Sequence, residues 1–148
     1  MQPPAEALAW LSGAQAHIAN VRRLREPSGT QRAGERSPGV VFVATAVRAP
    51  DLDAGEFDAH WRERHAPLAL RHHAGMSGYE QLTVKRTLGA PTPNPDGIAL
   101  LHFPDLASFR ERFYDSDAGR DAILADAREF LDLPRCRAIL ASEYWARV

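Results

Sequence analysis

Histidine and aromatic side chains share one predicted helix face near the middle of this chain. Residues 57–73 read FDAHWRERHAPLALRHH. Side chains three or four residues apart lie on the same side of an α-helix. The residues at such intervals are Phe57, Trp61, His65, Leu68 and His72. A face that combines apolar groups with imidazoles is suited to binding an apolar compound and to moving a proton on it.

Pro67 interrupts this helix two residues after His65. A proline inside a helix removes one backbone hydrogen bond and clashes with the carbonyl four residues earlier, here that of Glu63. We therefore expect the helix to kink or restart at this point. Such a break frees backbone polar groups beside His65.

His65 is the first candidate for a catalytic acid or base. An imidazole has an unperturbed pKa near ~6.5, so modest changes in its surroundings make it an acid or a base at neutral pH. The apolar neighbours Trp61 and Leu68 favour the neutral form. The alternative role is structural: His65 hydrogen-bonds a carbonyl freed by Pro67 and fixes the kink.

His102 is a second candidate for proton transfer. It lies in the apolar segment 98–103, from which it could point into a ligand cavity. The side chains expected to contact a substrate there are Phe57, Trp61, Leu68, Tyr79, Phe130 and Tyr144. Packing in the core is the alternative for the aromatic residues. The hydroxyls of Tyr79 and Tyr144 are suited to holding a substrate carbonyl or phenol.

Structural roles are expected for the other polar residues. His72 and His73 end the predicted helix, where cations interact favourably with the helix dipole, and are expected as surface caps. Asp126 and Glu129 have capping-box spacing, which predicts a helix start at that point. Cys136 is expected to be a small buried residue.

Composition argues against several partners. The 148 residues carry a formal net charge of −1, which provides no strong field for nucleic acid or an anionic membrane. No apolar run approaches ~18 residues, so we expect no membrane span, and no basic region precedes the first apolar residues, so we expect no secretory signal. The only cysteine, Cys136, fits a reducing cytoplasm.

Motifs for nucleotides, hydrolysis and metals are missing from the sequence. No P-loop, GxGxxG, GxSxG or HExxH pattern occurs. The spacing of His65, His72 and His102 matches no zinc pattern. We therefore expect no metal and no cofactor.

The pattern from residue 40 onward alternates strands and helices. Apolar or β-branched runs bounded by Gly or Pro predict strands over 40–47, 77–88, 98–103 and 135–145. One helical zone follows the turn at 51–55. A second helical zone begins at Pro104, with Ser116 as the N-cap of a helix through Leu124.

Residues 1–38 are expected to be an N-terminal arm before a domain at 39–148. The arm reads as a short helix near 4–13, a second helix over 14–26, and a polar linker rich in Gly, Ser and Pro. We expect the arm to dock on the domain or on a partner. A linker without fixed structure is the alternative.

The β-α-β-β-α-β order predicts an α+β, ferredoxin-like fold with a four-stranded antiparallel sheet and helices on one face. The strands over 40–47 and 98–103 are apolar on both sides, so the other face of the sheet also needs a cover. The economical cover is the same face of a second copy. We therefore expect a homodimer.

Four segments carry a family resemblance: FDAHWRERHAPLA, MSGYEQLTV, DGIALLHFPDLASFRERFYDSDAGRDAILADAREFLD and ASEYW. Together they resemble the EthD domain of the dimeric α+β barrel superfamily, over about residues 40–148. The resemblance implies a homodimer and a pocket between the sheet and its helices. Its superfamily includes cofactor-free cyclases, dehydratases, decarboxylases, isomerases and monooxygenases. In several cofactor-free members, a histidine at the position of His65 acts as acid or base.

Three functions are consistent with these residues. The first is cofactor-independent proton transfer on a small aromatic or polyketide-like compound, with His65 moving the proton and His102 assisting. The second is binding of a small hydrophobic compound without catalysis, or service to an oxygenase. The third is a cofactor-free monooxygenase, which requires oxygen and an electron-rich phenolic substrate.

Overall fold

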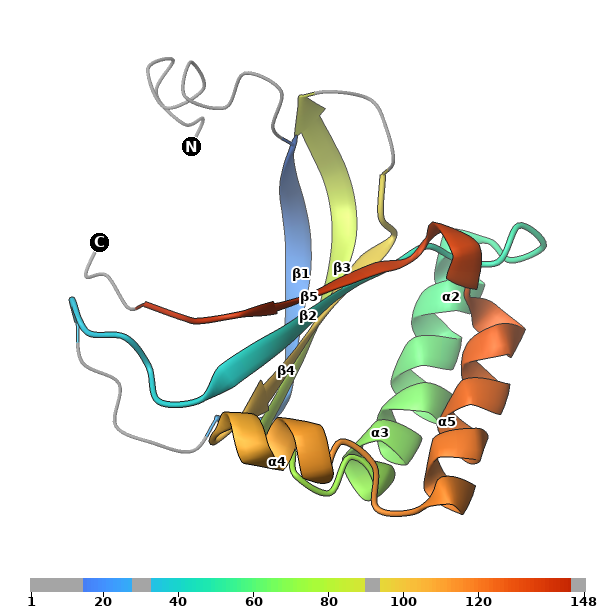
Figure 1. Cartoon of the computed structure of the whole chain (residues 1–148). Helices are drawn as coiled ribbons and strands as arrows, with labels where there is room; N and C mark the ends of the chain where they lie inside the picture. Colours follow the sequence, from blue (N-terminus) through green and yellow to red (C-terminus); the bar gives the residue numbers. More distant parts are fainter. Residues whose placement is uncertain (1–14, 28–32, 90–93, 145–148) are drawn as a thin grey trace.

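The computed structural model describes residues 15–27, 33–89 and 94–144 (Figure 1). The helix expected near residues 4–13 lies outside these ranges, as do part of the expected linker and the end of the last expected strand. No helix within these ranges has the length and apolar character needed to cross a membrane.

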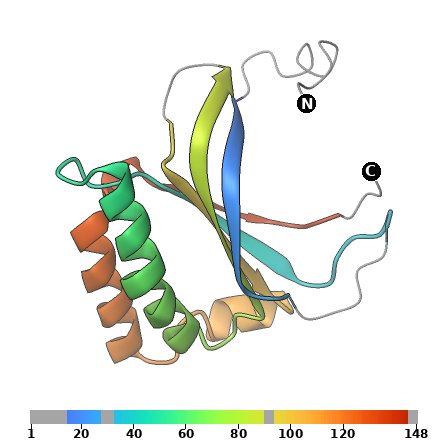
Figure 2. The same cartoon turned by 180° about the vertical axis from the view of Figure 1, so that it is seen from behind.

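A five-stranded antiparallel sheet forms the centre of the fold. Its strands are β1 (Gln15–Arg25), β2 (Val40–Ala46), β3 (Gly78–Gly89), β4 (Gly97–Phe103) and β5 (Arg137–Ala141). They lie in the order β1-β3-β4-β2-β5, with every neighbouring pair antiparallel. The helices pack against one face (Figures 1 and 2). The predicted α+β class and β-α-β-β-α-β order are therefore present, with one strand more than expected.

β1 is the additional strand, and the helix predicted over residues 14–26 is wrong. The strand pairs with β3 from Gln15 opposite Gly89 to Arg25 opposite Tyr79. Pairing of this length satisfies the backbone groups of β1 that face β3, and such context overrides weak helix propensity. Residues 15–25 therefore belong to the same sheet as β2 to β5.

The helix around His65 runs in three consecutive parts. They are α2 (Ala54–His60), the π-helical turn η1 (Trp61–His65) and α3 (Ala66–His72). Asp53 begins the run, because its carboxylate accepts hydrogen bonds from the backbone N–H groups of Gly55 and Glu56.

The irregularity expected at Pro67 takes the form of the π-helical turn. The N–H of Ala66 bonds to the carbonyl of Trp61, five residues earlier, where an α-helix would use the residue four earlier. The helix continues through Pro67 and does not restart. Because the wide turn contains an extra residue, side chains after it are displaced around the helix by about one position.

The second helical zone contains α4 (Leu106–Glu111), α5 (Asp117–Phe130) and the 3₁₀ turn η2 (Leu133–Arg135). Ser116 caps α5 as predicted, since its hydroxyl accepts from the N–H of Gly119. The expected end near Leu124 is wrong, because α5 continues to Phe130. Asp126 therefore lies inside this helix and not at a cap.

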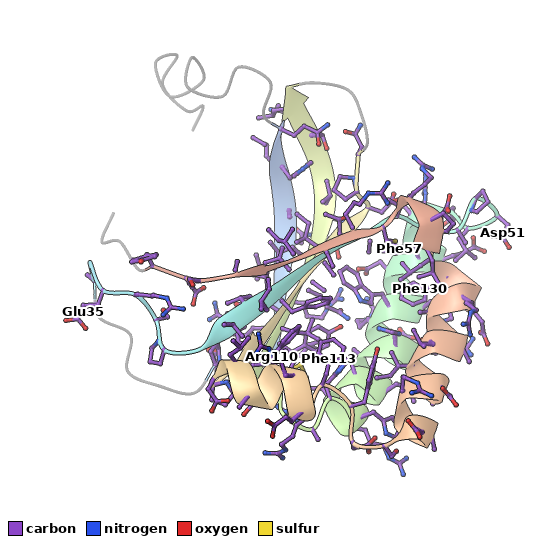
Figure 3. The ribbon with its side chains drawn as sticks, viewed as in Figure 1. Glu35, Asp51, Phe57, Arg110, Phe113 and Phe130 are labelled. Atoms are coloured by element: carbon purple, nitrogen blue, oxygen red, sulfur yellow. The ribbon has the colours of Figure 1, made fainter. Side chains whose placement is uncertain are left out.

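The core lies between the helices and the inner face of the sheet (Figure 3). We call the continuous run of α2, η1 and α3 the long helix. One cluster joins Phe57 and Trp61 of the long helix to Phe130 of α5. A second joins Tyr79 and Phe103 to residues of α3. Together the two clusters hold the long helix and α5 against the sheet.

The outer face of the sheet carries a group of apolar side chains beside the charged cluster of Glu80, His102 and Glu143, and no helix of the described residues covers it (Figures 1 and 2). Phe42 and Leu101 face the helices, so the alternating neighbours Val43 and Leu100 point the other way. We call the outer apolar face the set Val21, Val43, Leu82, Ile98, Leu100 and Ile139. Val21 and Ile139 are 59% and 64% exposed in the single chain.

Candidate functional site

A cavity of about 330 Å³ lies between the inner face of the sheet and the helices. Apolar residues of both layers dominate its wall: Phe42, Trp61, Ala69, Tyr79, Ala99, Leu101, Phe113, Ile123, Ala127 and Phe130. His65, His73 and Cys136 also line it. A volume of this order falls within the ~300–1,000 Å³ range of small-molecule sites.

The long helix contributes a stripe of side chains to the cavity at intervals of four: Trp61, His65, Ala69 and His73. The sequence interpretation placed Leu68 and His72 on this stripe, and neither residue lines the cavity. The π-helical turn explains the difference, since its extra residue moves the stripe from positions 68 and 72 to 69 and 73.

Asp126 of α5 binds two histidines of the long helix. One carboxylate oxygen lies 2.8 Å from Nδ1 of His65, and the other lies 2.9 Å from Nε2 of His60. The carboxylate is 6% exposed. Both imidazoles pack on Phe130, at ring-centre distances of 5.0 Å for His65 and 4.6 Å for His60. The expected capping role of Asp126 is therefore wrong.

This contact determines which nitrogen of His65 carries hydrogen. Burial acts to raise the pKa of Asp126, but hydrogen bonds from His65 and His60 outweigh it and hold the pKa below its ordinary value. An ionised carboxylate only accepts hydrogen bonds, so Nδ1 of His65 is the donor. The alternative in which His65 binds a freed carbonyl is also wrong, because Nδ1 is held by Asp126.

The second nitrogen of His65, Nε2, has no hydrogen-bond partner among the described residues. Within that part of the chain, the buried polar side-chain atoms that lack a partner are Ser37 Oγ and His102 Nε2. Nε2 of His65 is therefore not fully buried. His65 lines the cavity, so we infer that Nε2 faces it.

A second polar network holds Tyr79 on the sheet side of the cavity. The side-chain amide nitrogen of Gln81 donates to the hydroxyl of Tyr79 at 3.0 Å and to the carbonyl of Trp61 at 3.2 Å. Arg22 of β1 donates to the amide oxygen of Gln81 at 2.7 Å and also binds Asp58. Gln81 is completely buried. β1 therefore orients a residue that bonds to the cavity wall.

The hydroxyl of Tyr79 is left as a hydrogen-bond donor. Burial raises the pKa of Tyr79 to about 12, so the group stays protonated at neutral pH. Because its oxygen already accepts from Gln81, its own O–H is available for an acceptor.

The cluster of His60, Asp126 and Glu129 has donor atoms close enough to hold a metal ion. Arg64 argues against that use. Its guanidinium lies 2.9 Å from Glu129 and 3.8 Å from Asp126, so a cation already occupies this position. The two carboxylates are thus neutralised by the protein itself.

Other predicted site residues lie away from the cavity. Phe57 is 1% exposed and packs behind Trp61 and Phe130. Tyr144 is 68% exposed and forms an isolated bridge with Arg36. Of the residues expected to contact a substrate, the structure places Trp61, Tyr79 and Phe130 on the cavity wall.

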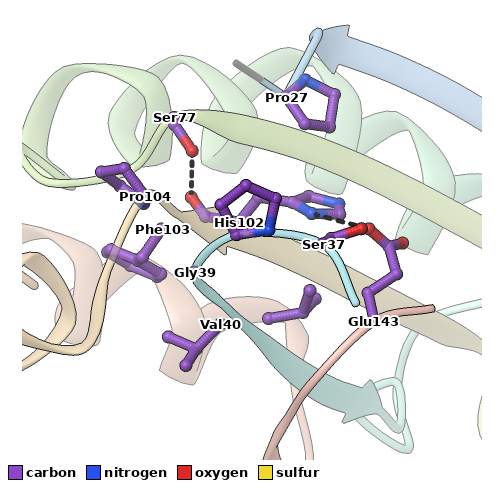
Figure 4. A pocket seen from close by; sticks show the side chains of 11 residues that line it. Pro27, Ser37, Gly39, Val40, Ser77, His102, Phe103, Pro104 and Glu143 are labelled. Atoms are coloured by element: carbon purple, nitrogen blue, oxygen red, sulfur yellow. Dashed lines mark hydrogen bonds and ion pairs between the residues drawn. The ribbon is translucent and has the colours of Figure 1, made fainter. Parts of the chain in front are cut away.

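His102 does not point into the cavity as expected. Leu101 occupies the inner face, so His102 projects to the opposite side of the sheet, where Figure 4 shows it beside Glu143 and Ser37. Its ring nitrogens lie 3.6 Å from Glu80 and 4.0 Å from Glu143. The space there is about 20 Å³, the size of one water molecule.

The sequence predicts other roles for two residues of the site: Asp126, which binds His65, and His73, which lines the cavity. For Asp126 the sequence does carry a signal. Asp126 falls on the stripe of Ile123, Ala127 and Phe130, which are buried in α5. An acidic residue on an apolar helix stripe indicates a buried partner. His73 had no comparable signal, because its place depends on the π-helical turn.

Comparison with known proteins agrees with this fold. A model of the EthD domain matches residues 49–134, which is more than half of the chain and contains His65, His73 and Asp126. A crystal structure of an ethyl tert-butyl ether D (EthD) family protein from Bacillus halodurans matches with a TM-score of 0.50 and 22% identity, over 71% of this chain and 98% of that chain. A search of curated proteins found no match. The chain belongs to the EthD family.

Proposed function

We propose that this protein binds a small aromatic or other apolar ring compound in the inner cavity and catalyses a cofactor-independent proton transfer on it. The reaction class is that of a cyclase, dehydratase, decarboxylase or isomerase. The observation that carries the proposal is the fixed geometry of His65. Its Nδ1 is held by the buried carboxylate of Asp126, while Nε2 is open to an apolar cavity.

His65 is equipped to act as a general base and then as a general acid. With hydrogen on Nδ1, the lone pair of Nε2 takes a proton from a C–H or O–H group of the ligand. Asp126 stabilises the resulting imidazolium, and Nε2 then returns the proton to another atom of the same compound. Oxidation states do not change, so no redox partner is needed.

Tyr79 provides a matching group on the sheet side. Removal of a proton beside a carbonyl places negative charge on the carbonyl oxygen. A fixed donor in a site of low polarity stabilises that charge. The O–H of Tyr79, whose oxygen is held by Gln81, is such a donor.

The aromatic wall accounts for the expected ligand class. Trp61, Phe113 and Phe130 line the cavity together with small residues of the strands. Rings of this kind pack well against flat apolar compounds. A flat ring compound is therefore the simplest occupant of the site.

We also infer that two chains pair through the outer apolar face. Each large aliphatic side chain covered there contributes roughly 1.5–3 kcal/mol. Pairing would leave the cavities open on the helix side of each sheet. The dimer predicted from the strand pattern thus remains the simplest cover for this face.

A second candidate function is ligand binding without turnover, including service to an oxygenase. The second hydrogen bond of Asp126 favours this reading, because its contact with His60 ties α5 to α2 and gives the carboxylate a structural role. A third candidate, the cofactor-free monooxygenase, differs in requiring oxygen.

Proton exchange tests these candidates. Aryl methyl ketones such as 1-acetylnaphthalene are incubated in D₂O with the protein, and exchange of the methyl protons is followed by ¹H NMR. A general base accelerates such a step by about 10²–10⁴-fold. We expect His65→Asn to lose this acceleration, since the Asn amide keeps the contact with Asp126 but has no group at Nε2.

The controls separate the three readings. A folded His65→Asn protein that exchanges at the wild-type rate contradicts the catalytic role. Ligand binding without exchange supports the non-catalytic reading. Consumption of a phenolic probe in air but not under argon supports the monooxygenase reading.

A further inference from the structure

His73 is a buried imidazole that the proposed proton transfer does not use. It follows the last residue of α3 and is 5% exposed. Its ring stacks on Tyr114 at a ring-centre distance of 5.2 Å and meets the edge of Phe113 at 4.7 Å. His73 also lines the cavity that contains His65. Aromatic contacts on two sides therefore fix this ring in the cavity wall.

Nδ1 of His73 already has a hydrogen-bond partner. Nδ1 lies 2.7 Å from the carbonyl oxygen of Phe113. A carbonyl only accepts, so Nδ1 carries the hydrogen. Burial lowers the pKa of His73 to about 4, which leaves the ring neutral at pH 7. Nε2 is consequently a lone-pair acceptor.

We infer that Nε2 of His73 faces the cavity. Within the described ranges it has no hydrogen-bond partner. It is also not fully buried. Among the described residues, the fully buried side-chain polar atoms without a partner are Ser37 Oγ and His102 Nε2. The cavity is the space that the ring borders. A bound compound thus meets an unsatisfied acceptor at this position.

The two cavity histidines are held through the same ring nitrogen. A protein acceptor holds the Nδ1 hydrogen of each one, Asp126 for His65 and the Phe113 carbonyl for His73. With Nδ1 as the donor, the neutral form of each ring has its lone pair on Nε2. Tyr79 offers the complementary O–H donor. In a mostly apolar pocket, a few such groups decide which compound binds and how it is oriented.

We propose that His73 is a ligand-binding residue, whose Nε2 accepts a hydrogen bond from a hydroxyl group of the compound that His65 contacts. The inference rests on the proposed function, since it takes the inner cavity as the ligand site. It specifies a flat apolar ring compound with two phenol or enol hydroxyls, one for each imidazole.

An ether or a carbonyl in place of the second hydroxyl is disfavoured. It would oppose one acceptor with another and leave both without a partner after water is expelled. Leaving a buried polar group without a partner costs more free energy than a satisfied hydrogen bond contributes. The site therefore selects for donors at two positions.

Calorimetric titration with matched naphthalenes tests the proposal. Because eight residues separate His65 from His73, about 12 Å along a helix, the hydroxyls of the probe must lie at opposite ends of its ring system. The probes are 2,6-dihydroxynaphthalene, 6-methoxy-2-naphthol and naphthalene, and the protein is the full chain. The wild type is expected to bind the dihydroxy probe roughly 5- to 160-fold more tightly than the mono-ether, because the ether leaves the buried Nε2 acceptor without a donor. In His73→Asn this ratio is expected to fall to about 1, since one acceptor is lost.

The variant and its control are chosen to preserve the fold. The Asn amide nitrogen occupies the place of Nδ1 and can still donate to the Phe113 carbonyl, but no atom reaches the place of Nε2. The control is His72→Asn, which changes the adjacent histidine that binds Asp115 outside the cavity. It is expected to keep the wild-type ratio.

The possible failures are distinguishable. If naphthalene and both hydroxylated probes fail to bind the wild type, the proposed function fails and this inference fails with it. If they bind and His73→Asn keeps the wild-type ratio, this inference alone is overturned. Should His73→Asn not fold, ¹⁵N-histidine NMR of the wild type decides: the dihydroxy probe must shift the Nε2 resonance of His73, and an unchanged resonance overturns the proposal.

Discussion

Asp126 of α5 lies 2.8 Å from Nδ1 of His65, across the interface between two helices that both cover the sheet. The same carboxylate binds His60 through its other oxygen. One buried acidic residue therefore sets the hydrogen position on the candidate base and joins the two helices. Loss of this residue should affect both stability and chemistry.

Asp126→Asn is expected to lower the free energy of unfolding by about 1–3 kcal/mol. The substitution replaces one accepting oxygen by an amide group that faces an imidazole N–H donor. Urea denaturation measures the change, and ¹⁵N NMR of His65 should show loss of the Nδ1–H form. Glu129→Gln serves as the control, because Glu129 is exposed on the same helix and binds Arg64. Its expected effect is within about 0.5 kcal/mol. Equal effects of the two substitutions would contradict the central role of Asp126.

Arg22→Met tests the contribution of β1. Arg22 bonds to Gln81 and Asp58, and Gln81 in turn bonds to Tyr79. We expect a loss of about 1–3 kcal/mol in unfolding free energy, since the buried amide oxygen of Gln81 loses its donor. Weaker binding of a cavity ligand should accompany it.

The control for β1 is Arg62→Met. Arg62 also pairs with Asp58, but its side chain is 45% exposed and it does not contact Gln81. Exposed pairs of this spacing contribute about 0.3–0.5 kcal/mol. If both arginine variants lose the same stability, β1 is not supporting the site through Gln81.

Much of the fold follows from the sequence because its signals are local. The apolar run of β2, the Ser116 cap and the order of strands and helices each depend on neighbouring residues. β1 was mistaken for a helix because its structure comes from pairing with β3, a segment about sixty residues away. A uniform helical period of 3.6 residues predicts that Leu68 contacts a substrate and that His72 shares its helix face. The π-helical turn shifts that face to Ala69 and His73. His102 illustrates a third limit: an apolar strand does not show which of its faces meets the helices.

Substitutions on the outer apolar face test the dimer. Ile139→Lys and Leu100→Lys place charges where a second sheet would pack, and an unpaired charge in an apolar interface is strongly disfavoured. We expect a change from dimer to monomer in analytical ultracentrifugation, with the fold retained for Ile139→Lys because that side chain is 64% exposed in the single chain. Leu106→Lys on α4 is the matched control, since Leu106 is an exposed leucine outside this face. A wild-type protein that sediments as a monomer would refute the dimer directly.

The pH dependence of stability should reflect His73. Burial lowers its folded-state pKa to about 4 from 6.5. Between these values the unfolded chain binds a proton that the folded chain does not, so the contribution is complete above about pH 6.5 and is lost as the pH falls toward about 4. The shift corresponds to on the order of 3 kcal/mol. Urea denaturation at intervals between these pH values should show the decline in the wild type and a flatter profile in His73→Asn. Parallel profiles for the two proteins would mean that His73 is not held neutral in the folded chain.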